Sequence, residues 1–137
     1  MLEKIEHLGY AVEDLNAAAR FYEERFGVGV GAPEEVADQG IRAVMFRVGE
    51  SKIELLEPTR EDSPVAKFLG KRGPGFHHVA FEVEDIRAAL KELKDGGVEL
   101  IDEEPRVGAG GTRMAFVHPR DAFGVLTELV ERPNGKE

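Results

Sequence analysis

Apolar and polar residues alternate in the first part of the chain and then take up a helical spacing. Residues 5–12 alternate with the two-residue period of a strand. In residues 14–25 apolar side chains recur every three or four positions, which predicts a helix with Asp14 as its N-cap and Gly27 at its end. Residues 28–36 form a weaker predicted strand. The chain therefore opens with a strand, a helix and a second strand.

The next segment predicts a hairpin and a short connecting helix. Strands are expected at residues 41–48 and 52–57, with the turn at Gly49 between them. A helix is expected at residues 63–71, because Ser63 suits an N-cap and proline follows it at the first helical position. The second half of the chain predicts a strand at 77–83, a helix at 85–95 capped by Asp85, and strands near 98–101, 112–118 and 124–130.

An internal repeat relates the two halves. Residues 7–18 match residues 78–89 at six of twelve positions, with a spacing of 71. Residues 54–58 resemble residues 128–133 with a spacing of 74, and short differences in loop length account for the change. Two matches in the same order indicate that the chain arose by duplication.

The duplication predicts an α+β fold of two tandem βαβββ modules. We predict a single domain, residues 1–137, with modules at about 1–60 and 76–133 and a short helical linker at 61–75. A module of roughly 65 residues rarely buries enough surface to be stable alone. We therefore expect the two sheets to pack into one curved, barrel-like structure with a central cavity.

Composition limits the chemistry. The formal net charge is −9, which argues against nucleic-acid and membrane-surface partners because both are anionic. The chain has no cysteine, so a bound metal would need nitrogen and oxygen ligands. The chain has neither an N-terminal signal segment nor a long apolar run, and we expect a cytoplasmic protein.

Four side chains in matching places of the two modules could hold one divalent metal ion. His7 and His78 lie on the first strand of each module, and Glu54 and Glu128 lie on the last. Imidazole nitrogens and carboxylates suit such an ion, and two carboxylates neutralise its charge. A lone strand histidine is more often structural, and alternation could turn either glutamate outward. The match across the repeat favours the metal site.

The two remaining histidines are assigned different places. His77 precedes His78 and must face the other side of the strand, so we interpret it as structural or as a support for the site. His118 stands in a turn before the last predicted strand, and we interpret it as a loop residue with substrate contact as the alternative.

Six segments resemble the methylmalonyl-CoA epimerase family of the vicinal-oxygen-chelate superfamily. The similarity runs from about residue 5 to residue 131. The paired His and Glu positions carry the resemblance to the superfamily, and the other motifs carry the resemblance to the epimerases. The segments are Glu6–Val12, Ile53–Pro58, Asp62–Ala66, Phe76–Val83, Glu104–Gly108 and His118–Leu129.

The resemblance implies a vicinal-oxygen-chelate fold and an isomerase that interconverts the 2R and 2S forms of methylmalonyl-CoA by metal-assisted proton abstraction at C2. It implies cobalt, manganese, nickel or zinc, held by His7, Glu54, His78 and Glu128. Glu128 is the first candidate for the catalytic base and Glu54 the second. Some bacterial relatives carry a glutamate where this chain has Ala43, so the second proton-transfer group stays open.

The resemblance also implies partners and leaves alternatives. Methylmalonyl-CoA is the expected ligand, and a homodimer is expected. A glyoxalase-I-like lyase or isomerase could use the same four ligands, whereas a metal-free binding module of this fold typically lacks them. A dioxygenase would use three ligands, two histidines and one glutamate, so the fourth candidate ligand argues against that reaction. Cations that could bind the CoA phosphates are Lys67, Lys71, Arg72, Arg113 and Arg120.

Overall fold

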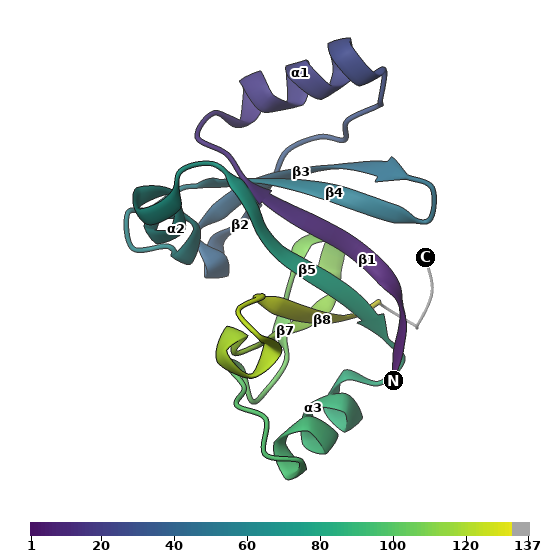
Figure 1. Cartoon of the computed structure of the whole chain (residues 1–137). Coiled ribbons are helices and arrows are strands. Elements are labelled where there is room, and N and C mark those ends of the chain that lie inside the picture. The colour runs from purple at the N-terminus through teal and green to yellow at the C-terminus, as the bar shows by residue number, and fades with distance from the viewer. Residues whose placement is uncertain (133–137) are drawn as a thin grey trace. The chain divides into compact units, whose positions relative to one another are not determined.

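The computed structural model describes residues 1–132 (Figure 1). In chain order its helices and strands are β1 (Leu2–Ala11), α1 (Leu15–Phe26), β2 (Glu34–Val36), β3 (Ile41–Val48), β4 (Ser51–Pro58), α2 (Pro64–Arg72), β5 (Gly75–Val83), α3 (Ile86–Asp95), β6 (Arg106–Val107), β7 (Arg113–Val117) and β8 (Thr127–Glu131). Three short 3-10 helices are Ala37–Gln39, Ala109–Gly111 and Pro119–Ala122. None of the helices in the described part is long and apolar enough to cross a membrane.

The chain divides into two compact units. The first unit is His7–His77, and the second unit combines Met1–Glu6 with the chain from His78 onward. Each boundary lies inside a strand, in β1 and in β5. The single domain proposed from the sequence stays a prediction, and the predicted end of its second module, residue 133, lies outside the described residues.

In the first unit the strand order is β2-β3-β4-β1. Strands β2, β3 and β4 pair antiparallel, and β1 pairs parallel to β4. Helix α1 runs along one side of β3 and β4 (Figure 1). It begins where the Asp14 side chain accepts a hydrogen bond from the Ala17 N–H, and it ends at Gly27, whose φ of 68° is left-handed. The buried core between α1 and the sheet of the first unit contains Leu15, Val44, Phe46 and Leu55.

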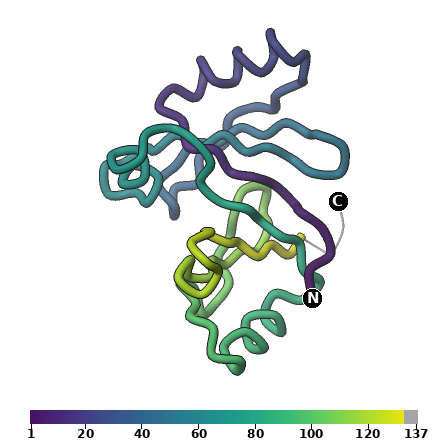
Figure 2. Tube along the Cα trace, viewed as in Figure 1, coloured from purple at the N-terminus to yellow at the C-terminus, as the bar shows by residue number. Residues whose placement is uncertain are grey.

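The second unit repeats this plan. Its strand order is β5-β8-β7-β6, with β5 parallel to β8 and the other pairs antiparallel. Helix α3 begins where the Asp85 side chain accepts from the Ala88 N–H. Figure 2 traces the same strand-to-helix path in both halves of the chain. The buried core under α3 contains Val83, Ile86, Ala89, Leu90, Ala115, Val117 and Leu129.

Three predicted strands have different extents in the structure. The strand expected at 28–36 is reduced to Glu34–Val36, because glycines and a proline fill the segment before it and pair poorly in a sheet. In the segment 98–101 Leu100 alone forms a bridge, to Val117, and no strand results. The last strand begins at Thr127 rather than at 124.

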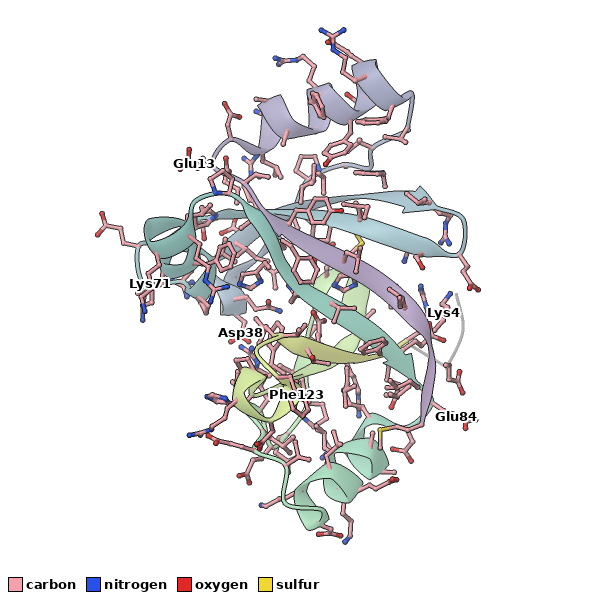
Figure 3. All side chains as sticks on the ribbon, in the orientation of Figure 1. Lys4, Glu13, Asp38, Lys71, Glu84 and Phe123 are labelled. Atoms are coloured by element: carbon pink, nitrogen blue, oxygen red, sulfur yellow. The ribbon has the colours of Figure 1, made fainter. Side chains whose placement is uncertain are left out.

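The late start of β8 has a backbone cause. Phe123, in the loop before this strand (Figure 3), has a φ of 57°, and Gly124 has a φ of 90°. Neither value is compatible with an extended strand. The short strand Arg106–Val107 was not predicted. The remaining predicted helices and strands agree with the structure within a few residues, which is the usual uncertainty of element ends.

Candidate metal centre

In the first unit His7 and Glu54 form a buried pair. Strands β1 and β4 run parallel with Gly9 opposite Glu54. His7 precedes Gly9 by two residues, so its side chain projects from the same face of the sheet as that of Glu54. The His7 Nε2 atom lies 3.3 Å from the Glu54 Oε1 atom. The two side chains therefore present a nitrogen and an oxygen donor side by side.

In the second unit His78 and Glu128 form the equivalent pair. Strand β5 runs parallel to β8 with Ala80 opposite Glu128, so the histidine again stands two residues before the partner of the glutamate. The His78 Nε2 atom lies 3.0 Å from the Glu128 Oε1 atom. The same register and the same pair of atoms recur in the two units, which is the outcome expected of the sequence repeat.

A second glutamate in each repeat explains why the first one faces away from the helix. Glu57 and Glu131 follow Glu54 and Glu128 by three residues, an odd spacing that turns them to the opposite face of the sheet. The Glu57 Oε2 atom accepts a hydrogen bond from the Leu15 N–H at 3.0 Å, at the start of α1. The Glu131 Oε1 atom accepts from the Ile86 N–H at 2.8 Å, at the start of α3.

The two glutamates of each repeat therefore have different roles. The later glutamate satisfies a free N–H of a helix N-terminus, where a negative charge is favourable. The earlier one is left for the face that carries the histidine. Sequence reasoning did not assign a role to Glu57 or Glu131, although the repeat had already marked both positions.

The donor set fits a divalent metal. His7, Glu54 and His78 are buried, and each offers a nitrogen or carboxylate oxygen as a candidate ligand. Glu128 is 7% exposed and lies beside His78. Glutamate is rarely buried without a partner of opposite charge, and two buried carboxylates would balance a dication. The residues that the sequence put forward as ligands are thus buried in two His-Glu pairs.

Apolar side chains stand next to both pairs, and Lys52 stands directly opposite His7. The His78 ring meets the Phe116 ring edge-on, with 5.5 Å between the centroids. In the first unit Met45 stands opposite Glu54 and Ala43 opposite Leu56, so β3 turns both residues to the face of Glu54. Neither carries a titratable group. Strand β3 therefore supplies no base at these two positions.

His77 and His118 have contacts outside the two pairs. His77 is half-buried and its ring contacts Phe68 edge-on, at 5.0 Å between centroids. His118 caps a 3-10 helix, with its Nδ1 atom accepting from the Arg120 N–H at 3.0 Å. His77 thus has a packing contact and His118 lies in a turn, and the roles interpreted for them from the sequence stay predictions. The five candidate CoA-binding cations are exposed: Lys67, Lys71, Arg72, Arg113 and Arg120.

Fold and site together define a class. Residues 6–116 match the family model of the glyoxalase/bleomycin resistance protein/dioxygenase superfamily. The ethylmalonyl-CoA/methylmalonyl-CoA epimerase of Cereibacter sphaeroides is 43% identical over 131 residues, which cover 94% of this chain and 98% of that protein. Human mitochondrial methylmalonyl-CoA epimerase is 40% identical over 129 residues, covering 93% and 73% of the two proteins.

Solved structures agree. One is a methylmalonyl-CoA epimerase in complex with methylmalonyl-CoA and NH4+, which is 42% identical and has a TM-score of 0.96. The match covers 100% of this chain and 99% of that one. The chain therefore belongs to the methylmalonyl-CoA epimerase family of the glyoxalase/bleomycin resistance protein/dioxygenase superfamily. The predicted family and the predicted α+β, vicinal-oxygen-chelate fold class are confirmed.

Proposed function

We propose that this chain is an isomerase that interconverts the 2R and 2S forms of methylmalonyl-CoA by moving a proton at C2. The observation that carries the proposal is the similarity to proteins named for this activity, at 40% identity or more along nearly the whole chain. The two buried His-Glu pairs supply chemistry suited to the reaction, because abstraction of a proton beside a thioester needs a base and a way to offset the charge that develops.

We propose that His7, Glu54, His78 and Glu128 hold one divalent ion of the cobalt, manganese, nickel or zinc type. The recurrence of one register and one pair of donor atoms in both units supports a shared centre. When bound, such an ion supplies positive charge that offsets the negative charge developing on the thioester oxygen. Burial of the two pairs strengthens that electrostatic effect by excluding water.

Glu128 is proposed to take the proton from C2. A carboxylate is a suitable base for a carbon acid whose product charge is stabilised, and Glu128 is buried beside His78 rather than dispersed in solvent. Inversion requires that a proton leaves one face of C2 and returns to the other. One fixed carboxylate reaches one face, so a second proton-transfer group is needed.

Three sources can provide that second group. Glu54 occupies the position equivalent to Glu128 in the first unit, and a water molecule is the second source. The third is a residue near Gln39 that compensates for Ala43. Glu34 on the edge strand β2 stands directly opposite Ala43, and directly paired residues project from the same face. We infer that Glu34 is the carboxylate to test there.

The test is exchange of the C2 proton of methylmalonyl-CoA with deuterium oxide, followed by NMR in the presence of a defined divalent metal. E128Q is expected to slow exchange by about 10²- to 10⁴-fold, the usual contribution of a general base. E131Q is the matched control, because it alters the same residue type on the same strand but on the opposite face. Unchanged exchange in E128Q would refute its role.

The second group is identified by comparing E54Q with E34Q. Loss of inversion with retained exchange at C2 indicates that the variant has lost the group that returns the proton on the opposite face. If both variants invert C2 at the wild-type rate, a water molecule or another residue fills this role.

A glyoxalase-I-like reaction remains the competing function, since it also moves a proton near a metal. Turnover of the glutathione–methylglyoxal hemithioacetal in place of methylmalonyl-CoA would favour it. Metal analysis of the purified protein distinguishes both enzymes from a metal-free binding module. The homodimer, the cytoplasmic location and the absence of a nucleic-acid partner stay predictions, and sedimentation measures the first.

A further inference from the structure

A buried cluster of alternating charges lies in the second unit, outside the proposed ligands. The Arg132 Nη2 atom lies 2.6 Å from Glu6 Oε2, and its Nε atom lies 2.9 Å from Glu82 Oε1. Lys4, labelled in Figure 3, places its Nζ atom 3.9 Å from the same Glu82 oxygen. Arg132 is 8% exposed and Glu6 is 3% exposed. Two cations and two carboxylates thus balance one another, with Arg132 and Glu6 buried and Lys4 and Glu82 partly exposed.

The cluster repeats the geometry of the His78–Glu128 pair one step further along the sheet. Glu82 follows His78 by four residues on β5, and Arg132 follows Glu128 by four residues at the end of β8. Even spacing keeps each side chain on the face of the ligand that precedes it. Four residues of strand span about 13 Å. The cluster and the ligand pair therefore belong to the same face of the same two strands.

Glu6 connects the cluster to the remaining histidine. Glu6 directly precedes His7 in β1, so its ion pair anchors the backbone next to that histidine. A shift of β1 by one residue would remove His7 from its place beside Glu54. Around His7 the apolar residues of β1 specify the register poorly, because Ile5 is 44% exposed and Leu8 is half-buried, whereas Ala11 at the end of the strand is fully buried. The charged contact of Glu6 is the more specific register signal.

We propose that Arg132 and Glu6 are positioning residues of the proposed metal centre: their buried ion pair holds β1 in place directly before His7, the histidine that stands beside Glu54. The inference rests on the proposed function, because it presupposes the metal. It requires arginine in particular. The guanidinium contacts two carboxylates through two different nitrogens, whereas a lysine ammonium is a single point of charge.

The experiment titrates Co²⁺ into the full chain and records its visible absorption spectrum, which reports the ligand geometry. Circular dichroism first establishes that each variant is folded at the temperature used. E6Q, R132M and R132K are expected to bind Co²⁺ about 10- to 100-fold more weakly, the usual cost of losing a support of a metal ligand. Their spectra are expected to shift toward that of H7A.

R87M is the matched control, because Arg87 pairs with Glu104 on the exposed surface of the same unit. It should bind Co²⁺ as the wild type does, with the same spectrum. If folded E6Q and R132K also match the wild type in affinity and spectrum, the positioning role is refuted. If the wild type itself binds no Co²⁺, the proposed metal centre fails, and the inference falls with it; that failure is seen before any variant is made. E6Q keeps the test open if R132M does not fold.

Discussion

The two units differ in the contacts that they make at one equivalent place of the repeat. By the repeat spacings, Glu82 corresponds to Ala11, Arg132 to Pro58 and Glu6 to His77. The second unit therefore has a charge cluster where the first has uncharged Ala11 and Pro58 and a histidine that contacts Phe68 of α2. At this place the first unit has an aromatic contact between His77 and Phe68.

Other features are the same in both units. Each keeps a His-Glu pair with the same register, an aspartate that caps the helix, and a glutamate that bonds the first helical N–H. The difference teaches that the two copies share the side chains of the proposed metal ligand set and of the helix starts. They diverged where each unit makes contacts of its own, the charge cluster in one and the aromatic contact in the other.

The largest predicted effect tests the equivalence of the two histidines. H7A and H78A should each lose tight metal binding, and each should lower epimerase activity by about 1000-fold, because the bound metal provides several kcal/mol of charge stabilisation. Isothermal titration with Zn²⁺ and a steady-state assay measure the two effects. H118A is the control and should retain metal binding. Full activity of H7A would overturn the ligand assignment.

The next effect distinguishes the two ends of the sheet. R132M should lower the free energy of unfolding by about 3–5 kcal/mol, because it removes the arginine that pairs with the buried Glu6 carboxylate. H77A, at the equivalent place of the first unit, should cost only about 1 kcal/mol, the order of one aromatic contact. Urea unfolding followed by circular dichroism compares them. Equal losses would mean that the charge cluster has no special structural role.

A smaller effect should be the same in both units. D14A and D85A each remove an N-cap that accepts a backbone hydrogen bond at 3.0 Å. Each should destabilise the protein by about 1 kcal/mol. Thermal unfolding of the two variants should therefore give equal shifts within error, with N16A on the exposed face of α1 as the control. Destabilisation of one variant alone would show that the two N-caps do not contribute equally to stability.

The smallest effects are on exposed charges. The hydrogen bond from Arg60 lowers the pKa of Asp62 below its ordinary 3.8, so its contribution to stability is present above that pH and is lost as the pH falls through the lowered pKa. The hydrogen bond to Glu103 raises the pKa of Lys94 above 10.5, so its contribution is present below that pH and is lost as the pH rises through the raised pKa.

NMR titration measures both values. R60M should return Asp62 to its ordinary pKa, and E103Q should do the same for Lys94. Both groups are exposed to solvent, which screens such pairs, and neither variant should alter the metal centre. A change in Co²⁺ binding in either variant would show that surface charge reaches the site and would weaken the comparison with the buried cluster.

Several features of this protein could be predicted from the sequence alone. Asp14, Asp85 and Ser63 were recognisable as N-caps, and all three accept the expected hydrogen bonds, because a cap depends on residues within one helical turn. The repeat was likewise readable without coordinates. It paired His7 with His78 and Glu54 with Glu128, because a duplication repeats the order of residues and this order is visible in the sequence.

Other features required the tertiary structure, because they depend on residues far apart in the chain. Residues 28–33 were expected in a strand, but their glycines and proline leave pairing to three residues of β2. The sequence put forward Glu54 and Glu128, but the capping roles of Glu57 and Glu131 depend on contacts with helix starts more than forty residues away. Arg132 lies 126 positions from Glu6, so no local pattern could reveal that pair. Local sequence determines where a helix starts, whereas the pairing of distant strands determines which buried charges meet.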